Sequence, residues 1–340
     1  MTEPVHKGAK VVVVGTGMVG ASFAYTAVMK GLISELVLID LDRDRAEGEA
    51  MDLNHSLPFA SPMKIYAGDY PDCADAQIIV ICAGAPQKPG QTRLDLAKTN
   101  TQIMKDIVQR ITRYNNDTIL LVASNPVDVL TYAAIEYSGF SPRRVIGSGT
   151  ILDTARLRYL IAEQMGLDPR SVHAYVIGEH GDSELVVWSS ANIAGIRIQD
   201  FCPVCRSYYN GPILEEIFHN VRNAAYEIIK RKKATYYGIA MGLHRIVESI
   251  LLDQGSVWTV STLVNDYYGV NDVCLGMPAV INSTGIDKIL RIPLNEEEEK
   301  LFKASAEIVK EVTYGALGRS QERTNGTLDS YVLDNPRADQ

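Results

Sequence analysis

Short apolar runs alternate with segments of helical pattern from Lys10 to Gly147, and this alternation restricts the fold more than any other feature of the chain. The first run, KVVVV at 10–14, is β-branched and ends at Gly15, and the small and apolar residues of 18–30 are typical of a helix packed closely on a sheet. Parallel strands need a crossover, which the intervening helices provide. The pattern therefore predicts an α/β fold whose N-terminal part is a doubly wound parallel sheet, covered by helices on both faces.

The same periodicity places the remaining elements. We expect further strands at 35–40, 76–84, 118–124 and 143–147, and helices at 43–57, 95–114 and 127–137. After Gly149 the pattern becomes mixed, with helices at 151–166, 210–231 and 235–248, antiparallel strands within 256–286, and a closing helix with an acidic first turn. We predict a parallel-sheet domain at 8–149, a mixed α+β substrate domain at 150–318 and a polar tail at 319–340.

A glycine-rich turn, GTGMVG at 15–20, stands between the first strand and the first helix. Gly15 permits a tight turn, Gly17 lets the backbone approach a pyrophosphate, and Gly20 lets helix and strand pack closely. Asp40, at the end of the second strand, would bind a ribose diol and repel a 2′-phosphate, which favours NAD over NADP. The alternative is a glycine turn that binds no ligand. We predict a Rossmann domain with these NAD contacts: Gly15, Gly17, Met18, Val19, Gly20, Asp40, Ala83 and Gly84.

Composition excludes several other classes of protein. With 46% hydrophobic and 22% charged residues, the 340-residue chain can bury a sizeable core, and its formal charge of −8 argues against a nucleic-acid partner. The chain has no apolar run long enough to span a bilayer and begins without a secretory signal, so we expect a cytoplasmic protein with no membrane contact. Cys202 and Cys205 form one C-x-x-C without a second pair, which leaves metal, redox or packing roles open; we predict no metal site.

Three segments carry side chains suited to acid–base chemistry. His180 lies between glycines in GEHG, and imidazole is the side chain best matched to proton transfer near neutral pH, although a lone histidine is more often structural. Asp153 and Arg156 are three residues apart on one predicted helix; they would orient the histidine and hold a carboxylate, or simply pair with each other. Arg93 ends a Gly- and Pro-rich loop that begins at Gly84 and could close over a ligand.

Taken together, six motifs resemble the L-lactate and malate dehydrogenase family, and its bacterial lactate-forming members in particular, from Lys10 to Gly315. They are GTGMVG, PQKPGQTRLDL, SNPVDVL, GTILDTARLRYL, IGEHGDSE and ATYYGIAMGL, in the family's order. The resemblance implies an NAD-dependent oxidoreductase. It implies His180 as acid/base, Asp153 as its orienting partner, Arg156 as the carboxylate clamp and Arg93 as the polarising arginine. It further implies Asn125 and Thr235 as substrate or nicotinamide contacts, and Ile239 as an apolar wall beside the nicotinamide.

The loop residue Gln87 bears on the substrate. In this family an arginine there pairs with the second carboxylate of oxaloacetate, whereas a neutral glutamine leaves that carboxylate unpaired, so Gln87 favours pyruvate. Lys88 tempers this, because a neighbouring cation could tolerate a dicarboxylate. The prediction is reversible pyruvate reduction to L-lactate, the last step of fermentative glycolysis. A reductase of larger 2-oxo acids, a malate dehydrogenase and a nucleotide-binding regulatory protein remain as alternatives.

Two further positions match family members activated by fructose 1,6-bisphosphate. They are Arg158, two residues after the clamp, and His173 in SVHAYV. The resemblance implies that both recur across a two-fold subunit interface, where a bisphosphate would relieve their repulsion and favour a homotetramer. The alternative is that both only make interface hydrogen bonds.

Overall fold

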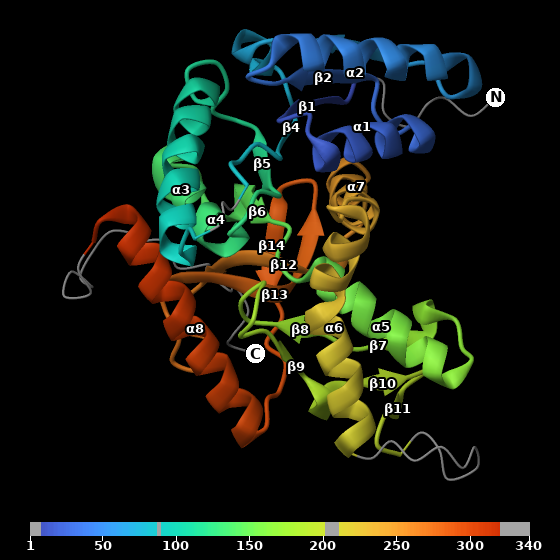
Figure 1. Cartoon of the computed structure of the whole chain (residues 1–340), viewed down its shortest axis with the longest axis vertical. Coiled ribbons are helices and arrows are strands. Elements are labelled where there is room, and N and C mark those ends of the chain that lie inside the picture. Colours follow the sequence, from blue (N-terminus) through green and yellow to red (C-terminus); the bar gives the residue numbers. More distant parts are fainter. Residues whose placement is uncertain (1–7, 87–89, 201–210, 320–340) are drawn as a thin grey trace, which may run out of the picture.

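A nine-stranded sheet runs through the centre of the computed structural model, which describes residues 8–86, 90–200 and 211–319 (Figure 1). Four positions named from the sequence, Gln87, Lys88, Cys202 and Cys205, and the tail beyond Arg319 lie outside the described residues.

The N-terminal two-thirds of this sheet is parallel, as predicted. Its order is β3-β2-β1-β4-β5-β6, so the strand order reverses between β1 and β4, which is where doubly wound sheets bind ligands. The strands are β1 (Lys10–Val14), β2 (Glu35–Ile39), β3 (Lys64–Ala67), β4 (Ile78–Ile81), β5 (Ile119–Val122) and β6 (Val145–Gly147). The sequence pattern missed β3, because this edge strand is short and only one of its four residues is fully buried.

Helices cover both faces of the parallel strands. They are α1 (Met18–Lys30), α2 (Arg43–Ser56), α3 (Arg93–Ile111) and α4 (Val127–Ser138). Alternate valines of β1 show the two faces: Val11 and Val13 pack in one cluster with α1 and α2, whereas Val12 and Val14 pack in another with α3 and α4. A strand buried on both sides must be apolar throughout, which explains the unbroken run KVVVV.

The sheet does not stop at the predicted domain division. The antiparallel strands β12 (Ser256–Val264), β13 (Val273–Asn282) and β14 (Gly285–Ile289) extend it beyond β6, where Ser261 pairs with Gly147. Gly149 is left-handed, with φ +52°, and a Cβ there would lie 2.6 Å from the carbonyl carbon of Val260. The predicted antiparallel strands are confirmed, but their pairing with the N-terminal sheet could not be predicted. The division at 149/150 stays a prediction.

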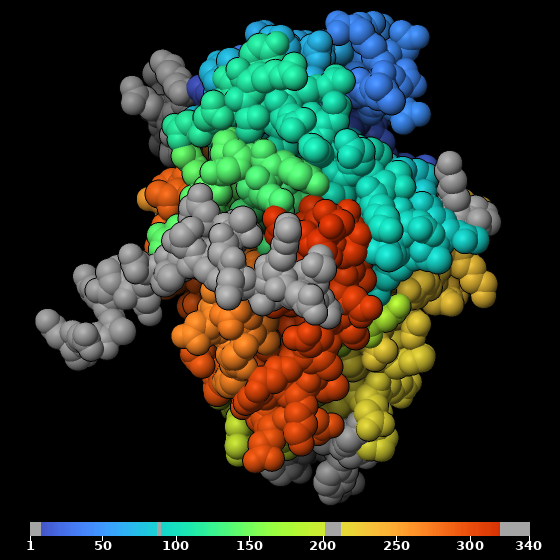
Figure 2. Space-filling model, turned by 90° about the vertical axis from the view of Figure 1, so that its left-hand side faces the viewer, coloured from blue at the N-terminus to red at the C-terminus, as the bar shows by residue number. Residues whose placement is uncertain are grey.

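The rest of the C-terminal half surrounds this extension. It contains α5 (Ile151–Met165), α6 (Gly211–Lys232), α7 (Tyr237–Leu251), α8 (Glu296–Leu317) and the short strands β7 (Val172–His173), β8 (Val176–Ile177), β9 (Leu185–Val186), β10 (Asn192–Ile193) and β11 (Ile196–Arg197). Figure 2 shows α8 exposed along one face beside α3. Asn295 and Glu298 form a capping box at the acidic first turn of α8. In the described ranges, no helix combines the length and apolarity needed to cross a membrane.

Candidate active site

The glycine turn has the close approaches that its sequence predicts. Gly15 is left-handed, with φ +98°, and a Cβ there would lie 2.5 Å from the backbone nitrogen of Ala83. A Cβ on Gly20 would overlap the carbonyl oxygen of Gly15, so strand and helix touch at this point. Nothing lies within 4 Å of a Cβ built on Gly17, the residue at the α1 N-cap, where no side chain caps the helix. Gly17 therefore leaves open space at the uncapped start of α1, where a phosphate would need room.

Asp40 ties the end of β2 to this turn. Its Oδ2 accepts hydrogen bonds from the backbone nitrogen of Thr16 at 2.6 Å and from the Thr16 hydroxyl at 3.0 Å, and Oδ1 accepts from the Asp42 nitrogen at 3.0 Å. Burial alone would raise the pKa of this carboxyl, but the three hydrogen bonds outweigh it and lower the pKa. Asp40 thus places a fixed negative charge beside the turn. Thr16, its main partner, was not singled out in the sequence.

The ends of β4 and β5 are held together behind the glycine turn. Asn100 of α3 accepts a hydrogen bond from the backbone nitrogen of Ala85 at 2.8 Å and donates to the carbonyl oxygen of Asn125 at 2.7 Å. The Ser124 hydroxyl donates to the carbonyl oxygen of Ala83 at 2.6 Å. A Cβ on Gly84 would lie 3.6 Å from both Asn100 and Ser124. Asn100 is therefore a framework residue that the sequence motifs did not reveal.

Two of the expected contacts come from the C-terminal half of the chain. Thr235 is half-buried in the link between α6 and α7, and Ile239, in the first turn of α7, packs on the core cluster that contains α1. Helix α7 also lies against α1 (Figure 1). This contact places Ile239 on the same side of the sheet as the helix that begins at the glycine turn.

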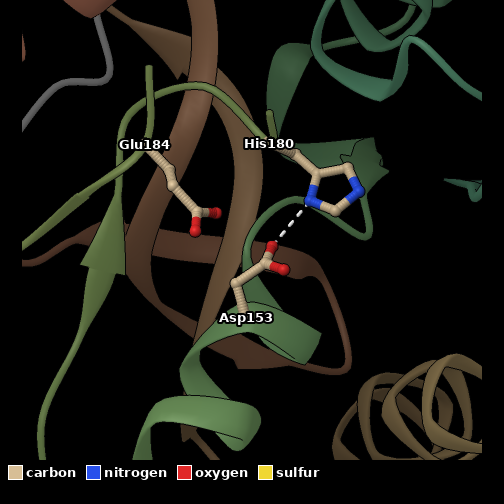
Figure 3. A group of neighbouring side chains, drawn as sticks. All are labelled: Asp153, His180 and Glu184. Atoms are coloured by element: carbon tan, nitrogen blue, oxygen red, sulfur yellow. Dashed lines mark hydrogen bonds and ion pairs between the residues drawn. The ribbon is translucent and has the colours of Figure 1, made fainter. Parts of the chain in front are cut away.

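His180 and Asp153 form the central pair of the site. The Nδ1 atom of His180 lies 2.6 Å from Oδ2 of Asp153, and the two side chains are 27% and 4% exposed (Figure 3). Burial alone would lower the pKa of His180, but the charge and hydrogen bond of Asp153, with a smaller contribution from Asp128, raise it to about 9. The same pairing lowers the pKa of Asp153. The geometry therefore favours a protonated imidazole whose Nδ1–H is fixed by Asp153, leaving Nε2 as the reactive atom.

Arg156 contacts the second oxygen of the same carboxylate. Its Nη1 donates to Oδ1 of Asp153 at 2.8 Å, and the side chain is 13% exposed. The intrahelical pair expected from the three-residue spacing is thus present. Because a guanidinium carries five N–H donors in a plane, this one bond leaves other donors for a ligand carboxylate.

A second carboxyl, that of Asp128, holds the His180 backbone. Its Oδ2 accepts from the His180 nitrogen at 2.8 Å and its Oδ1 accepts from the Ser261 hydroxyl at 2.6 Å. Burial raises the pKa of Asp128 to about 6. Asp128 belongs to SNPVDVL, so a motif contained it, but only the fold brings it to the histidine loop.

Glu184 completes a group of three with Asp153 and His180, whose donor atoms all lie within 4.8 Å of one another (Figure 3). The residue is 5% exposed, and in the part of the chain that the structure describes its Oε1 has no hydrogen-bond partner. Burial and the Asp153 charge raise the pKa of Glu184 to about 9. Both oxygens of Asp153 are already engaged by Arg156 and His180, so the group is better suited to holding protons than a metal ion.

Arg93 lies beside this histidine loop. It is the first residue of α3, after Thr92 at the N-cap, and its Nη2 donates to Oε1 of Glu179, the residue that precedes His180. The structure therefore gathers His180, Asp153, Arg156 and Arg93 from three distant segments of the chain. Glu179 was not predicted as a site residue, although it lies within GEHG.

Arg158 and His173 lie apart from this group. Arg158 lies two residues after Arg156 on α5, a spacing at which helical side chains do not face each other, and its Nε donates to the carbonyl oxygen of Ala174 at 3.1 Å. Burial lowers the pKa of Arg158. His173 is exposed at the end of β7, one residue before Ala174. The Arg158 guanidinium thus contacts the backbone one residue after His173.

Comparison with known proteins agrees with this arrangement. The family profile described as the lactate/malate dehydrogenase NAD binding domain matches residues 9–147, and that of the alpha/beta C-terminal domain matches residues 150–316. The chain is 52% identical over 303 residues to an L-lactate dehydrogenase of Acetivibrio thermocellus, covering 89% of this chain and 96% of that protein. It is 53% identical over 307 residues to that of Macrococcus caseolyticus, covering 90% and 97%.

Solved structures give the same result. A lactate dehydrogenase from a Medee basin deep-sea metagenome library superposes with a TM-score of 0.89 at 49% identity, covering 92% of this chain and all of that one.

Proposed function

This chain belongs to the lactate/malate dehydrogenase family and is an NAD-dependent oxidoreductase, and on that premise we propose that it reversibly reduces pyruvate to L-lactate. The observation that carries the proposal is the arrangement around Asp153, which contacts His180 at 2.6 Å and Arg156 at 2.8 Å. A proton donor and a carboxylate-binding cation thus share one buried anchor. That combination suits a substrate with a carboxylate next to a carbonyl.

The residues around the glycine turn fit NAD. Gly17 leaves open space at the uncapped start of α1, where a pyrophosphate would bind, and Asp40 carries the negative charge that suits an unphosphorylated ribose. Ala83, Gly84, Asn125 and Ile239 would line the remainder of the nucleotide site. When bound, NAD supplies the carbon that gives or accepts the hydride.

The side chains of this chain would handle the substrate and the proton. Arg156 would bind the pyruvate carboxylate through the donors that Asp153 leaves free. Arg93 would polarise the carbonyl as negative charge develops on its oxygen. His180 would give its Nε2 proton to that oxygen in the reductive direction and take it back in the oxidative one, while Asp153 stabilises the imidazolium. Asn125 and Thr235 would position substrate and nicotinamide.

The sequence-based argument for pyruvate predicts a change of preference on replacing Gln87 by arginine. The new cation would pair with the second carboxylate of oxaloacetate, which otherwise goes unpaired, so the oxaloacetate-to-pyruvate ratio of kcat/KM should rise at least about tenfold. The measurement is NADH oxidation with each substrate. Lys88→Arg, which keeps the neighbouring charge, is the control and should leave the ratio unchanged. An unchanged ratio in Gln87→Arg would show that this position does not select the substrate.

The first experiment follows NADH oxidation with pyruvate and oxaloacetate in parallel, each with and without fructose 1,6-bisphosphate. A strong preference for pyruvate supports the proposal. Faster turnover of oxaloacetate would make the enzyme a malate dehydrogenase, and activity on neither substrate would direct the search to larger 2-oxo acids. A protein that binds NADH but reduces no 2-oxo acid would be the regulatory alternative.

Regulation by fructose 1,6-bisphosphate and assembly as a cytoplasmic homotetramer belong to the same proposal. Arg158 supplies a guanidinium close to the imidazole of His173, and a second subunit facing them would repeat both groups. On this proposal a bisphosphate offsets the repulsion and favours the active assembly.

Neutralising Arg158 should therefore abolish activation without abolishing turnover. In Arg158→Gln, the severalfold rise in pyruvate reduction expected from the bisphosphate at low enzyme concentration should disappear. Arg170→Gln is the matched control, because Arg170 is an exposed arginine of the same region that pairs only with Asp168 among the described residues. If fructose 1,6-bisphosphate does not change the rate of pyruvate reduction by the wild-type enzyme, the proposed activation is wrong.

A further inference from the structure

The ion pair between Arg93 and Glu179 joins residues 86 positions apart and is unequal in burial. The Arg93 side chain is 42% exposed, whereas that of Glu179 is 6% exposed. A buried carboxylate is costly unless it has a charged or hydrogen-bonding partner, while a half-exposed arginine can be solvated by water. The pair therefore compensates the buried charge of Glu179. Arg93 does not need the pair for solvation, so the main effect of the pair on Arg93 is to fix its position.

Glu179 is held rigidly from its other side. Its Oε2 accepts hydrogen bonds from the backbone nitrogen of Ser183 at 3.2 Å and from the Ser183 hydroxyl at 2.5 Å. Its own backbone nitrogen donates to the hydroxyl of Ser305, a buried residue of α8, at 2.8 Å. One carboxylate oxygen is thus fixed by the histidine loop, and the second is presented to Arg93.

Gly181 provides independent evidence, because a side chain at this position would overlap the Arg93–Glu179 pair. A Cβ at this position would lie 2.6 Å from Nη2 of Arg93 and 3.1 Å from Cδ of Glu179. The backbone of Gly181 is not in the left-handed region, so the absence of a side chain provides space rather than conformational freedom. The guanidinium fills that space.

We propose that Glu179 is a positioning residue that holds Arg93 beside the histidine loop before substrate arrives. An unrestrained arginine side chain loses much rotamer freedom when it binds a substrate, and an arginine already anchored at one nitrogen loses less. The remaining N–H donors of the guanidinium stay available for the substrate carbonyl. The inference rests on the proposed function, in which Arg93 polarises that carbonyl.

A double-mutant cycle between Glu179→Gln and Arg93→Gln tests the proposal. A glutamine must either turn its amide nitrogen toward the guanidinium or turn it toward the Ser183 N–H, so one of the two contacts is lost. With Arg93 present, we expect Glu179→Gln to lower kcat/KM for pyruvate about tenfold, because Arg93 would then lose more rotamer freedom when substrate binds. With glutamine at position 93, the same change should alter kcat/KM by less than about twofold, because nothing remains to be positioned.

The matched control is Glu184→Gln. Glu184 is equally buried in the same loop, but its main electrostatic partners are Asp153, His180, Arg156 and Arg222 rather than Arg93. Its replacement should change kcat/KM by the same factor in both backgrounds. Gly181→Ala offers a second route if Glu179→Gln folds poorly, since its Cβ would displace the guanidinium. It should lower kcat/KM several-fold with Arg93 present and little without it.

The outcomes separate this inference from the proposed function. Equal losses for Glu179→Gln in both backgrounds, or a shifted pH profile of His180, would mean that Glu179 acts through the histidine or the fold, and the inference would be overturned while the function stands. No loss with Arg93 present would also overturn it. Full activity in Arg93→Gln alone would overturn the assignment of Arg93, and with it this inference. Thermal melting and NADH binding of each variant check that the fold and nucleotide site are intact.

Discussion

Replacing His180 by asparagine is expected to lower pyruvate reduction by about three orders of magnitude. Asparagine keeps a polar group near Asp153 but cannot carry a transferable proton, so the carbonyl oxygen must take its proton from water. Among the described residues, His180 pairs with Asp153 at 2.6 Å through Nδ1. This pairing leaves its second ring nitrogen, Nε2, to face a substrate. Steady-state NADH oxidation gives the rate, and NADH binding is expected to remain, because the glycine turn belongs to other elements.

The control for this variant is His219→Asn. His219 lies on α6, where its side chain contacts Asn223 of the same helix. Its replacement should leave turnover within about twofold of the wild type, since its contacts are local and exposed. Near-normal turnover in His180→Asn would show that His180 is not the proton donor.

Most of the fold could be predicted because its signals are local. A β-branched run such as KVVVV needs burial on both faces, and Gly20 meets a constraint that lies within one strand, turn and helix, because a Cβ there would overlap the carbonyl oxygen of Gly15. The Gly31 cap, with φ +63°, and the acidic first turn of α8 are equally local signals. The extension of the sheet by β12 is not local. It rests on the pairing of Ser261 in β12 with Gly147 in β6, which no periodicity of either segment encodes.

The candidate site divides in the same way. His180 and the Asp153–Arg156 pair carry signals in residue type and spacing, and a resemblance to known motifs joined them into one site. Glu179, Asp128 and Asn100 act through backbone nitrogens and neighbouring side chains that only tertiary structure brings close. Such residues look like ordinary polar positions in a sequence. Their functions follow from burial and hydrogen bonding, which a single sequence does not display.

Replacing Asp153 by asparagine is expected to change the pH dependence of the reaction as well as its rate. In the native enzyme the Asp153 charge holds the pKa of His180 at about 9, so the imidazole stays protonated, and ready to donate, up to that pH. Without this charge the pKa of His180 should fall, because burial is the largest influence on it and favours the neutral ring. Pyruvate reduction, which needs the protonated form, should then begin to fall at a lower pH than in the native enzyme, where it falls as pH rises through about 9. At pH 8 we expect a loss of about 100-fold or more in kcat/KM, from deprotonation and lost orientation together.

Asparagine also creates a conflict of hydrogen bonds. If its oxygen faces Arg156, its amide nitrogen faces Nδ1 of His180 and favours the unprotonated ring; if it is turned over, two donors meet at Arg156. The measurement is kcat/KM for pyruvate from pH 5.5 to 10. Asp182→Asn is the control, since Asp182 lies in the same loop but contacts the Tyr226 hydroxyl, and its profile should keep the native alkaline limb. If Asp153→Asn lowered the rate by the same factor at every pH, the carboxylate would orient the ring without setting its charge, and the account of His180 as a pre-protonated donor would fail.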